Sequence, residues 1–440
     1  MPQDDLRLTN TAANEHRRNE HRRPTTSSSQ ACRNEGDPSM SPAPRQMPFR
    51  RDVVCLAGAF ALTLAPMMAA AAPAIHISGS DEQVIPADAF NRCVEQHGAL
   101  TLADTPDAPP ALVVHPDGSR MLFAVMSQNV PFVAAPGGGW MRPGCNSVLP
   151  SRLDADPGHF AYQTWLAATW SRDGRHVFGL GHDEWHGWEV WPTCRARVGA
   201  GANDYDTCLR ISLSGYQSGN GGFAFAPISG QNPLAAPAAA PTLLNSLGFT
   251  RARIGDPSNL ATNPHDGYTY FLAMADGEGQ PQRGTCVFRA RDPFAGPWFT
   301  WDGAGFNQQT SGPDGQPGCT PARPWGLVTQ ALTFNTVIDA FIAIGQSDNH
   351  RLVAQTSHDL VHWSEPIALR TSIQPGWYRP GQPGPTPAQY FSLNDPDDPR
   401  ANMGISGAHP YLYYVSYPVG TGRVNYRMRE VWRVPLSVAP

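Results

Sequence analysis

The sequence lacks any sustained helical period after about residue 75, because no later segment repeats apolar residues every three to four positions. Glycine and proline, with 42 and 44 residues, are too frequent for long helices. Apolar residues still make up 41% of the chain and aromatic residues 10%, which is enough for a sizeable core. These features predict an all-β protein.

The chain also lacks an excess of positive charge. Its formal net charge is −5 at pH 7 and its pI is near 6.3, so nothing indicates a nucleic-acid partner. It has no Cys-x-x-Cys spacing of the kind that a cysteine-based metal site would show. We therefore expect neither nucleic-acid binding nor a cysteine metal centre.

The first 72 residues are expected to lie outside the folded domain. Residues 1–46 have no apolar periodicity and are rich in polar residues and proline, so we expect them to be disordered or to precede the true start at Met47. Residues 47–72 have the order of a signal peptide: an arginine pair, an apolar run and small residues. The arginine pair hints at twin-arginine export, and the apolar run is too short for a confident membrane span. We expect a secreted or periplasmic domain at residues 73–440, without stable membrane association after cleavage.

Six of the eight cysteines follow the predicted signal peptide. An even number of cysteines in an exported chain favours disulfide bonds. Their order along the chain favours pairing Cys93 with Cys145, Cys194 with Cys208, and Cys286 with Cys319.

A pair of strands joined by a tight polar turn recurs along the chain. The predicted pairs are residues 111–114 with 121–126, 164–170 with 176–180, 260–263 with 268–274, 326–333 with 337–344, and 403–406 with 411–417. Further strands follow several pairs, which is typical of the blades of a β-propeller. We expect a five-bladed β-propeller, or six blades if residues 212–226 form another. Residues 74–78 are placed to supply the closing strand.

Residues 179–188 concentrate polar and aromatic side chains directly after an apolar segment. The spacing of His182 and His186 is that of a zinc-protease helix. That motif needs a glutamate beside the first histidine, where this chain has Asp183. Three glycines in the stretch also disfavour a helix.

In an extended strand, alternation places His182, Glu184 and His186 on one side and Asp183 and Trp185 on the other. A carboxylate between two imidazoles suits acid–base chemistry on a sugar. The alternative is a polar cluster that only holds a loop by hydrogen bonds.

In an antiparallel blade, the residues before the first strand and after the second lie at the same mouth of the channel. This rule gathers several carboxylates with arginine and tryptophan, which fits glycoside hydrolysis by a pair of carboxyl groups. The candidate catalytic residues are Glu184, Asp256 and Asp183. The candidate substrate-binding residues are His182, His186, Trp185, Arg323, Trp325 and Asp156. Asp107 is also placed at this mouth, as a solvated rim residue. Asp117, Asp173 and Asp266 are predicted turn residues at the opposite mouth.

Residues 356–363, Thr-Ser-His-Asp-Leu-Val-His-Trp, resemble the Ser-x-Asp-Leu-x-x-Trp signature of five-bladed propeller glycosidases, which include glycoside hydrolase families 43, 32 and 68. Residues 266–272 and 291–298 resemble strand phrases of the same group, and the likeness covers roughly residues 160–436. It implies an aspartate base, a glutamate acid and an aspartate that orients the acid, each from a different blade. Asp256 lies where an aspartate before an inner strand would lie. No residue near 80–110 matches the first-blade aspartate of family 43, so we expect a divergent member.

The leading function is a secreted glycoside hydrolase acting on plant or microbial polysaccharide or oligosaccharide. One alternative is a non-catalytic carbohydrate-binding propeller that relies on Trp185, Trp188 and Trp325. Another is a metal-dependent hydrolase or lyase that uses His182 and His186. We expect a monomer with no cofactor and no catalytic metal, although the channel leaves room for a structural Ca²⁺ or Na⁺.

Overall fold

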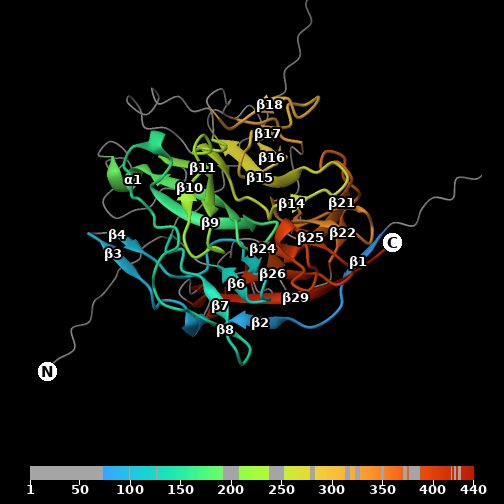
Figure 1. Cartoon of the computed structure of the whole chain (residues 1–440), viewed down its shortest axis with the longest axis horizontal. Coiled ribbons are helices and arrows are strands. Elements are labelled where there is room, and N and C mark those ends of the chain that lie inside the picture. Colours follow the sequence, from blue (N-terminus) through green and yellow to red (C-terminus); the bar gives the residue numbers. More distant parts are fainter. Residues whose placement is uncertain are drawn as a thin grey trace, which may run out of the picture. The chain divides into compact units, whose positions relative to one another are not determined.

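Strands make up nearly all of the regular structure and assemble into several sheets (Figure 1). The computed structural model describes residues 73–98, 100–124, 127–191, 208–236, 252–277, 283–312, 318–322, 328–347, 351–369, 374–375, 387–417, 419–420, 423–424 and 428–440. Within these residues the one α-helix is α1 (Gly187–Val190), and the 3-10 turns are η1 (Ala87–Ala89), η2 (Pro157–His159) and η4 (Ala401–Met403). The predicted all-β class is confirmed.

The predicted N-terminal segments lie outside the described residues. Disorder over residues 1–46 and a signal peptide over residues 47–72 therefore stay predictions. The described residues all fall within one compact unit, Ala71–Pro440. None of the helices among them has the length and apolar character needed to cross a bilayer.

The sheet nearest the start is an antiparallel meander, in which each strand pairs with the next. Its strands are β5 (Ala111–Val114), β6 (Arg120–Phe123), β7 (Phe132–Ala134) and β8 (Trp140–Met141). The carbonyl of His115 accepts the N–H of Gly118, and the positive φ of Gly118, 82°, suits glycine in this turn. Two short hairpins lie apart from the larger sheets: β3 (Glu95–His97) with β4 (Leu100–Leu102), and β27 (Val419–Gly420) with β28 (Arg423–Val424).

Two further meanders join into a ten-stranded sheet. The first contains β9 (Gln163–Trp170), β10 (Val177–His186), β11 (Leu209–Ser218) and β12 (Ala226–Pro227). The second contains β14 (Ala261–Thr262), β15 (Thr269–Gly277), β16 (Gly284–Ala290), β17 (Phe299–Thr300) and β18 (Gln308–Gln309). Strand β13 (Ala252–Gly255) joins them, because it pairs parallel with β11 and antiparallel with β15. Much of the region 212–226, which the sequence pattern could not place, is therefore the third strand of the first of these meanders.

Strand β10 is longer than the sequence pattern predicted, because it continues past Leu180 to His186. It pairs with β9 on one side and β11 on the other, with an irregularity between Leu180 and Gly181. A Cβ at Gly181 would lie 2.4 Å from the Tyr216 ring, so glycine is needed for the close packing here. The polar stretch is thus strand rather than loop.

Two more sheets contain the C-terminal strands. One consists of β19 (Val328–Asn335), β20 (Ala340–Gln346), β21 (Leu352–Ser357) and β22 (Ile367–Ala368), with β25 (Ile405–Ser406) parallel to β19. The other consists of β24 (Pro387–Asn394), β26 (Tyr411–Ser416) and β29 (Glu430–Ala439), with β23 (Gln374–Pro375) on β24. Strands β1 (Ala74–Ile77) and β2 (Glu82–Ile85) both pair with β29. The predicted closing strand at residues 74–78 therefore pairs with the last strand of the chain.

The predicted pairing of residues 403–406 with 411–417 is wrong. The partners of β26 are β24 and β29, whereas β25 lies against β19. The apolar period of β24 is hidden because the strand carries Gln389 and Ser392 as buried polar residues. Ser392 donates to the carbonyl of Pro110, and Gln389 accepts from the Tyr417 hydroxyl. An inner strand whose polar groups are satisfied in this way does not look like a strand in sequence.

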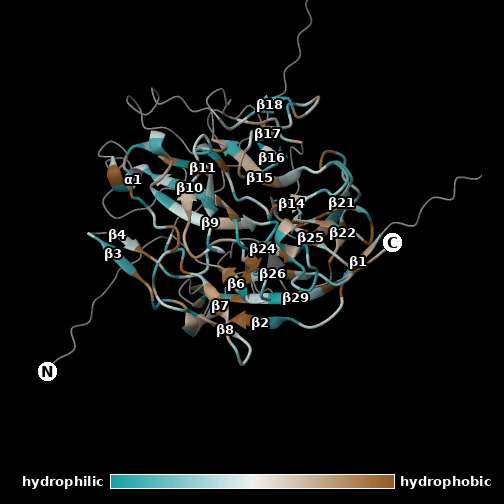
Figure 2. Cartoon of the chain, viewed as in Figure 1, coloured by the Kyte–Doolittle hydropathy of each residue, from teal (hydrophilic) through white to brown (hydrophobic). Residues whose placement is uncertain are grey.

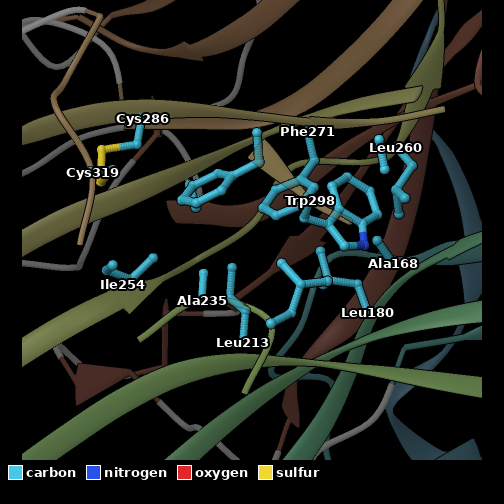
Figure 3. Close-up of a cluster of buried hydrophobic side chains, with 14 of the residues drawn as sticks. Ala168, Leu180, Leu213, Ala235, Ile254, Leu260, Phe271, Cys286, Trp298 and Cys319 are labelled. Carbon is cyan, nitrogen blue, oxygen red and sulfur yellow. A yellow bond between two sulfur atoms is a disulfide. The ribbon is translucent and has the colours of Figure 1, made fainter. Parts of the chain in front are cut away.

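Aromatic side chains fill the core between the strands. The colouring of Figure 2 changes between hydrophobic and hydrophilic residues along the strands. Figure 3 shows the cluster around Trp298 and Phe271, whose ring centroids lie 5.1 Å apart, close to Leu180 and Leu213. The Trp298 N–H donates to Gln231 Oε1, which satisfies the buried indole. Each such fully buried side chain contributes about 1.5–3 kcal/mol relative to exposure.

Two of the predicted disulfide bonds are confirmed, Cys93–Cys145 and Cys286–Cys319. Cys208 is also disulfide-bonded. Its predicted partner, Cys194, lies outside the described residues, so that pairing stays a prediction.

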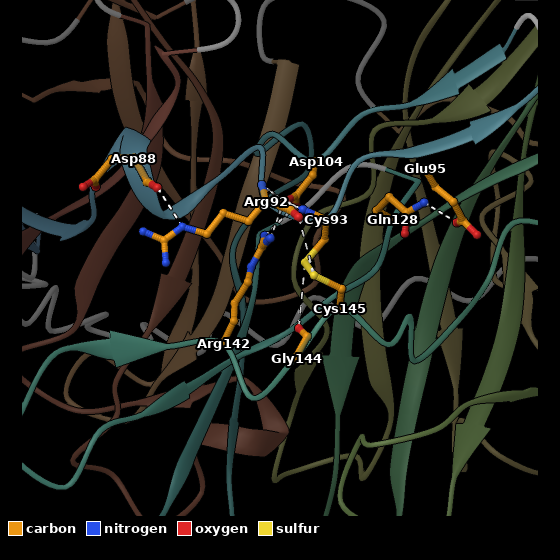
Figure 4. The surroundings of a disulfide bond; sticks show 9 residues. All are labelled: Asp88, Arg92, Cys93, Glu95, Asp104, Gln128, Arg142, Gly144 and Cys145. Atoms are coloured by element: carbon orange, nitrogen blue, oxygen red, sulfur yellow. Dashed lines mark hydrogen bonds and ion pairs between the residues drawn. A yellow bond between two sulfur atoms is a disulfide. The ribbon is translucent and has the colours of Figure 1, made fainter.

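The Cys93–Cys145 bond lies beside a buried ion pair (Figure 4). Asp104 is fully buried and contacts the Arg142 guanidinium through both carboxylate oxygens. It also accepts the backbone N–H groups of Arg92 and Cys93, at 3.1 and 3.0 Å. Asp104 is thus a structural residue that anchors the segment before β5.

Candidate active site

The C-terminal half of β10 brings His182, Glu184 and His186 onto one face of the sheet. Glu184 Oε1 lies 2.9 Å from His182 Nε2, and Glu184 Oε2 lies 2.8 Å from His186 Nε2. The histidine side chains are 10% and 8% exposed and the glutamate side chain is 18% exposed. The carboxylate is therefore held between two imidazoles in a largely dry environment.

Glu184 is ionised at neutral pH. Burial raises its pKa, but the hydrogen bonds and charges of His182 and His186 outweigh burial and hold the pKa well below its usual range. The family resemblance implied a glutamate that acts as the acid. The lowered pKa of Glu184 favours a role as base or nucleophile instead.

His186 is surrounded by acidic partners. Its Nδ1 lies 3.4 Å from Glu189 Oε1, and its ring stacks on Trp188 with centroids 4.5 Å apart. Burial lowers its pKa, but Glu184 and Glu189 together raise it to about 9. Glu189 also accepts a hydrogen bond from the Tyr162 hydroxyl at 2.8 Å.

His182 meets the backbone of another strand. The N–H of Asp256 donates to His182 Nδ1 at 3.2 Å, and the edge of the ring packs against Trp165. A Cβ at Gly255 would lie 2.6 Å from Ile211 Cγ2 and 3.0 Å from His182 Cε1, so glycine suits the close packing of both side chains against this strand. Burial lowers the pKa of His182, but the charges of Glu184, Asp256 and Asp183 raise it by a larger amount. The net shift is therefore upward.

Asp256 reaches the cluster through its backbone, and its side chain pairs with arginine. Arg253 Nη1 lies 2.8 Å from Asp256 Oδ2, and the same guanidinium contacts both oxygens of Asp276. The φ of Asp256 is 48°, which is a strained value for a residue that precedes proline. The structure thus places the backbone of Asp256 against His182, which contacts Glu184. The predicted pairing of the Glu184 and Asp256 carboxylates stays a prediction.

Asp107 is a residue of this site whose importance the sequence did not show. It precedes β5, forms an ion pair with Arg429, and accepts the Tyr390 hydroxyl at 2.7 Å. The pKa of Asp107 is raised. Burial and the negative charge of Glu184 raise it, and together they outweigh Arg429 and Tyr390, which lower it. The charge of Glu184, on β10, therefore acts on Asp107, which lies in the segment before β5. Tyr390 has a φ of 55°, a second strained backbone position beside the cluster.

Asp183 lies on the opposite face of β10 from Glu184. It accepts the Thr164 hydroxyl at 2.6 Å and the Tyr216 hydroxyl at 3.2 Å, and burial raises its pKa to about 6. Its charge reaches the site only through its effect on His182. The structure does not bring Asp183 together with the carboxylate of Glu184.

The remaining predicted site residues lie apart from the cluster or outside the described residues. Trp185 is buried, donates its N–H to the Ala155 carbonyl and packs on Trp191. Asp156 is more than half exposed and accepts the N–H of Gly158 at the start of η2. Arg323 and Trp325 lie outside the described residues.

The described residues contain no group of three or more His, Cys, Asp or Glu side chains arranged to hold a metal ion. The Nε2 atoms of His182 and His186 are both directed at Glu184. The arrangement is that of a hydrogen-bonded network.

No protein-family model matches the chain, and no curated protein matches it. Among solved structures, it is similar to Zg3597, a family 117 glycoside hydrolase from Zobellia galactanivorans, with 9% identity and a TM-score of 0.48 over 83% of this chain and 90% of that one. It is similar to an N-acetylgalactosamine deacetylase from F. plautii, with 11% identity and a TM-score of 0.40 over 82% and 95%. It is also similar to a thermostable family-43 glycoside hydrolase, with 12% identity and a TM-score of 0.37 over 78% and 91%.

Proposed function

We propose that this protein hydrolyses glycosidic bonds of a plant or microbial polysaccharide or oligosaccharide, without a cofactor. The observation that carries the proposal is the buried, ionised Glu184 between two imidazoles, and its charge also raises the pKa of the Asp107 carboxyl. Glycoside hydrolysis needs one group that donates a proton and one carboxylate that acts as base or nucleophile. Groups whose pKa values are moved in opposite directions supply such a division of roles.

In this proposal Glu184 is the base or nucleophile, because its pKa is lowered. The proton for the leaving oxygen comes from a neighbouring group whose pKa is raised. His186, whose pKa is raised to about 9, is protonated at neutral pH, and it is the donor that we favour. Asp107 is the alternative donor, although its ion pair with Arg429 favours the ionised carboxylate.

The same proposal assigns the fold as a five-bladed propeller. The supporting observation is that five runs of antiparallel strands follow one another in the described residues: β5–β8, β9–β12, β14–β18, β19–β22, and β24, β26 and β29 with β1. We further propose that residues 47–72 direct export of a domain beginning near residue 73. The two disulfide bonds fit an oxidising compartment.

The carbohydrate-binding alternative needs aromatic faces that a sugar can reach. Two of the three tryptophans on which it relied, Trp185 and Trp188, are 3% and 5% exposed and pack inside the protein, and the third, Trp325, lies outside the described residues. The buried cluster of ionisable groups has no purpose in that alternative, so we prefer the hydrolase.

The test is turnover by the exported, disulfide-bonded protein on a panel of aryl glycosides and polysaccharides. We expect Glu184→Gln to lower kcat by about 10²–10⁴-fold while binding is retained, because this is the usual contribution of a positioned acid or base. The exposed Glu365→Gln is the matched control and should leave kcat unchanged. Full activity of Glu184→Gln would overturn the assignment, and sensitivity of the wild type to a chelator would favour the metal-dependent alternative.

Leaving-group chemistry separates the two proton donors. A substrate with a very good leaving group needs little help from an acid. Loss of the true donor should therefore abolish turnover of ordinary glycosides but spare dinitrophenyl glycosides. We expect this pattern for His186→Gln, whereas Asp107→Asn should lose activity on both substrates.

A further inference from the structure

The two imidazoles that flank Glu184 have different partners on their other nitrogen. His182 Nδ1 receives the backbone N–H of Asp256 at 3.2 Å, so a donor points at it. His186 Nδ1 lies 3.4 Å from a carboxylate oxygen of Glu189 and also 3.4 Å from the amide nitrogen of Gln163, so a charged acceptor and a neutral donor both face it. On the Glu184 side the two rings are alike, since each directs Nε2 at one carboxylate oxygen. The two rings therefore differ in the groups that contact Nδ1.

A ring nitrogen that accepts an N–H must carry a lone pair. His182 can then hold its proton only on Nε2, where it donates to Glu184, and the ring is neutral. The carboxylates of Glu184, Asp256 and Asp183 favour a second proton on this ring, but that proton would have to face the Asp256 N–H. The backbone cannot turn away easily, because Gly255 packs directly against the ring.

The surroundings of His186 have the opposite effect. Glu189 is an acceptor when ionised, and its pKa is lowered because the effect of His186 outweighs that of burial. The Tyr162 hydroxyl donates to Glu189 at 2.8 Å and fixes the carboxylate. Gln163 Nε2 lies 3.4 Å from His186 Nδ1 and 3.5 Å from Glu189 Oε2. We infer that its amide donates to the carboxylate, because an ionised acceptor binds a donor more strongly than a neutral ring nitrogen does, and His186 Nδ1 then keeps its proton. Glu184 and Glu189 are thus the charged groups that face His186, and both favour imidazolium.

We propose that Glu189 is a positioning residue that keeps the site's mobile proton on His186, while the Asp256 backbone N–H keeps His182 as the neutral Nε2–H tautomer. Glu184 is then paired with one cation rather than two. The assigned protonation states follow from these contacts and do not depend on the proposed function. The catalytic consequence, that His186 is the ring that supplies the proton, rests on the proposed function.

The direct test is ¹⁵N NMR of the imidazole nitrogens in the folded, disulfide-bonded protein at neutral pH. His182→Gln and His186→Gln identify which signals belong to which ring. We expect two protonated nitrogens for His186, and one protonated and one unprotonated nitrogen for His182. A neutral His186 or a doubly protonated His182 would overturn the proposal.

Glu189→Gln then tests the positioning role, because it removes the charge but keeps the shape. Loss of a nearby opposite charge should lower the His186 pKa by about one unit or more and leave the His182 signals unchanged. Tyr162→Phe is the matched control: it removes a hydrogen bond to Glu189 but keeps the charge, so its effect should be smaller. An unchanged His186 titration in Glu189→Gln contradicts the proposal. If that variant does not fold, Glu189→Asp keeps the charge at a longer distance and should lower the pKa by a smaller amount.

Gly255→Ala probes the other ring. The new methyl group would lie 2.6 Å from Ile211 Cγ2 and 3.0–3.2 Å from the His182 ring, so the contact between His182 and the Asp256 N–H should lengthen, and the His182 Nδ1 signal should change while the His186 signals stay the same. In an activity assay, Glu189→Gln should move the basic limb of kcat/KM to lower pH by the same amount as the His186 pKa. If the protein hydrolyses no glycoside, the proposed function fails, but the NMR result still decides the protonation states.

Discussion

The molecule contains histidine–carboxylate contacts in two very different settings. In the site, His186 lies 2.8 Å from Glu184, with side chains 8% and 18% exposed. In the turn after β9, His176 lies 2.8 Å from Asp173, with side chains 69% and 48% exposed. The contact distances are equal, so the surroundings and not the contacts differ. Water screens the exposed pair, while burial makes the inner pair strong enough to set protonation states.

The exposed pairs belong to a turn that occurs twice. In residues 171–176 and again in residues 357–362, a serine hydroxyl donates at 2.6 Å to the carbonyl of the histidine five positions later. In each copy an aspartate oxygen accepts two backbone N–H groups and the other oxygen contacts the histidine ring. Asp173 is therefore a turn residue, as predicted. The second copy contains the Ser-x-Asp-Leu segment on which the family resemblance rested, so that signature is structural.

The largest expected difference is in catalysis. Under the proposed function, His186→Gln should lower kcat on ordinary glycosides by about 10²–10⁴-fold. His176→Gln removes a histidine that also contacts a carboxylate, and it should leave kcat within about twofold, since the residue is exposed and lies in a turn. Steady-state kinetics of the two variants checks this. An equal loss of kcat in both variants would contradict the proposed difference between the buried and the exposed histidine–carboxylate pair.

The next comparison concerns stability and uses two arginine–aspartate pairs. Arg142 and Asp104 are buried, whereas Arg120 and Asp397 are substantially exposed. Arg142→Met leaves a buried carboxylate without its cation and should cost about 3–5 kcal/mol, while Arg120→Met should cost about 0–1 kcal/mol. Urea unfolding of the disulfide-intact proteins measures both values. Similar losses of unfolding free energy in the two variants would mean that burial does not determine how much these ion pairs contribute to stability.

A smaller effect is expected in the pH dependence of stability. His186 has a pKa near 9 in the folded protein, above the unfolded value of about 6.5. A raised folded pKa gives stability that is fully present below the unfolded pKa and is lost as pH rises through the folded pKa. Unfolding free energy should therefore fall by about 1–3 kcal/mol between about pH 6.5 and 9, a fall that His186→Gln should reduce. A wild-type protein with flat stability over this range would argue against the raised pKa.

The smallest effect is expected in the exposed turn. His362→Ala removes a ring that is 86% exposed and contacts Asp359. The aspartate keeps its two backbone N–H partners, so the cost should be below about 1 kcal/mol. Thermal denaturation against the wild type is sufficient to measure it. A cost as large as that of Arg142→Met would show that the turn contributes more than an exposed pair can.

Local patterns predicted the strand pairs and the shared face of His182, Glu184 and His186, because both depend on the short period of a strand. The disulfide bonds followed from the order of the cysteines. The ion pair between Asp107 and Arg429 could not be predicted, since it joins residues 322 positions apart that are not distinctive in sequence. Strand β24 was missed because its buried polar side chains look like those of a loop. The donor on His182 was equally hidden, because it is a backbone N–H that any residue at position 256 would supply.

The pairing of β1 with β29 determines when the fold can be completed. The sheet that contains β24, β26 and β29 receives its outer strand from the beginning of the described chain, Ala74–Ile77. Until Glu430–Ala439 has been synthesised, β1, β2 and β26 all lack the strand that they share, and their backbone groups stay exposed. Unpaired edges of this kind are where nascent β proteins aggregate. The assembly of this sheet is therefore a late event, and a chain that is interrupted before residue 430 leaves β1 and β2 without a partner and β26 paired only with β24.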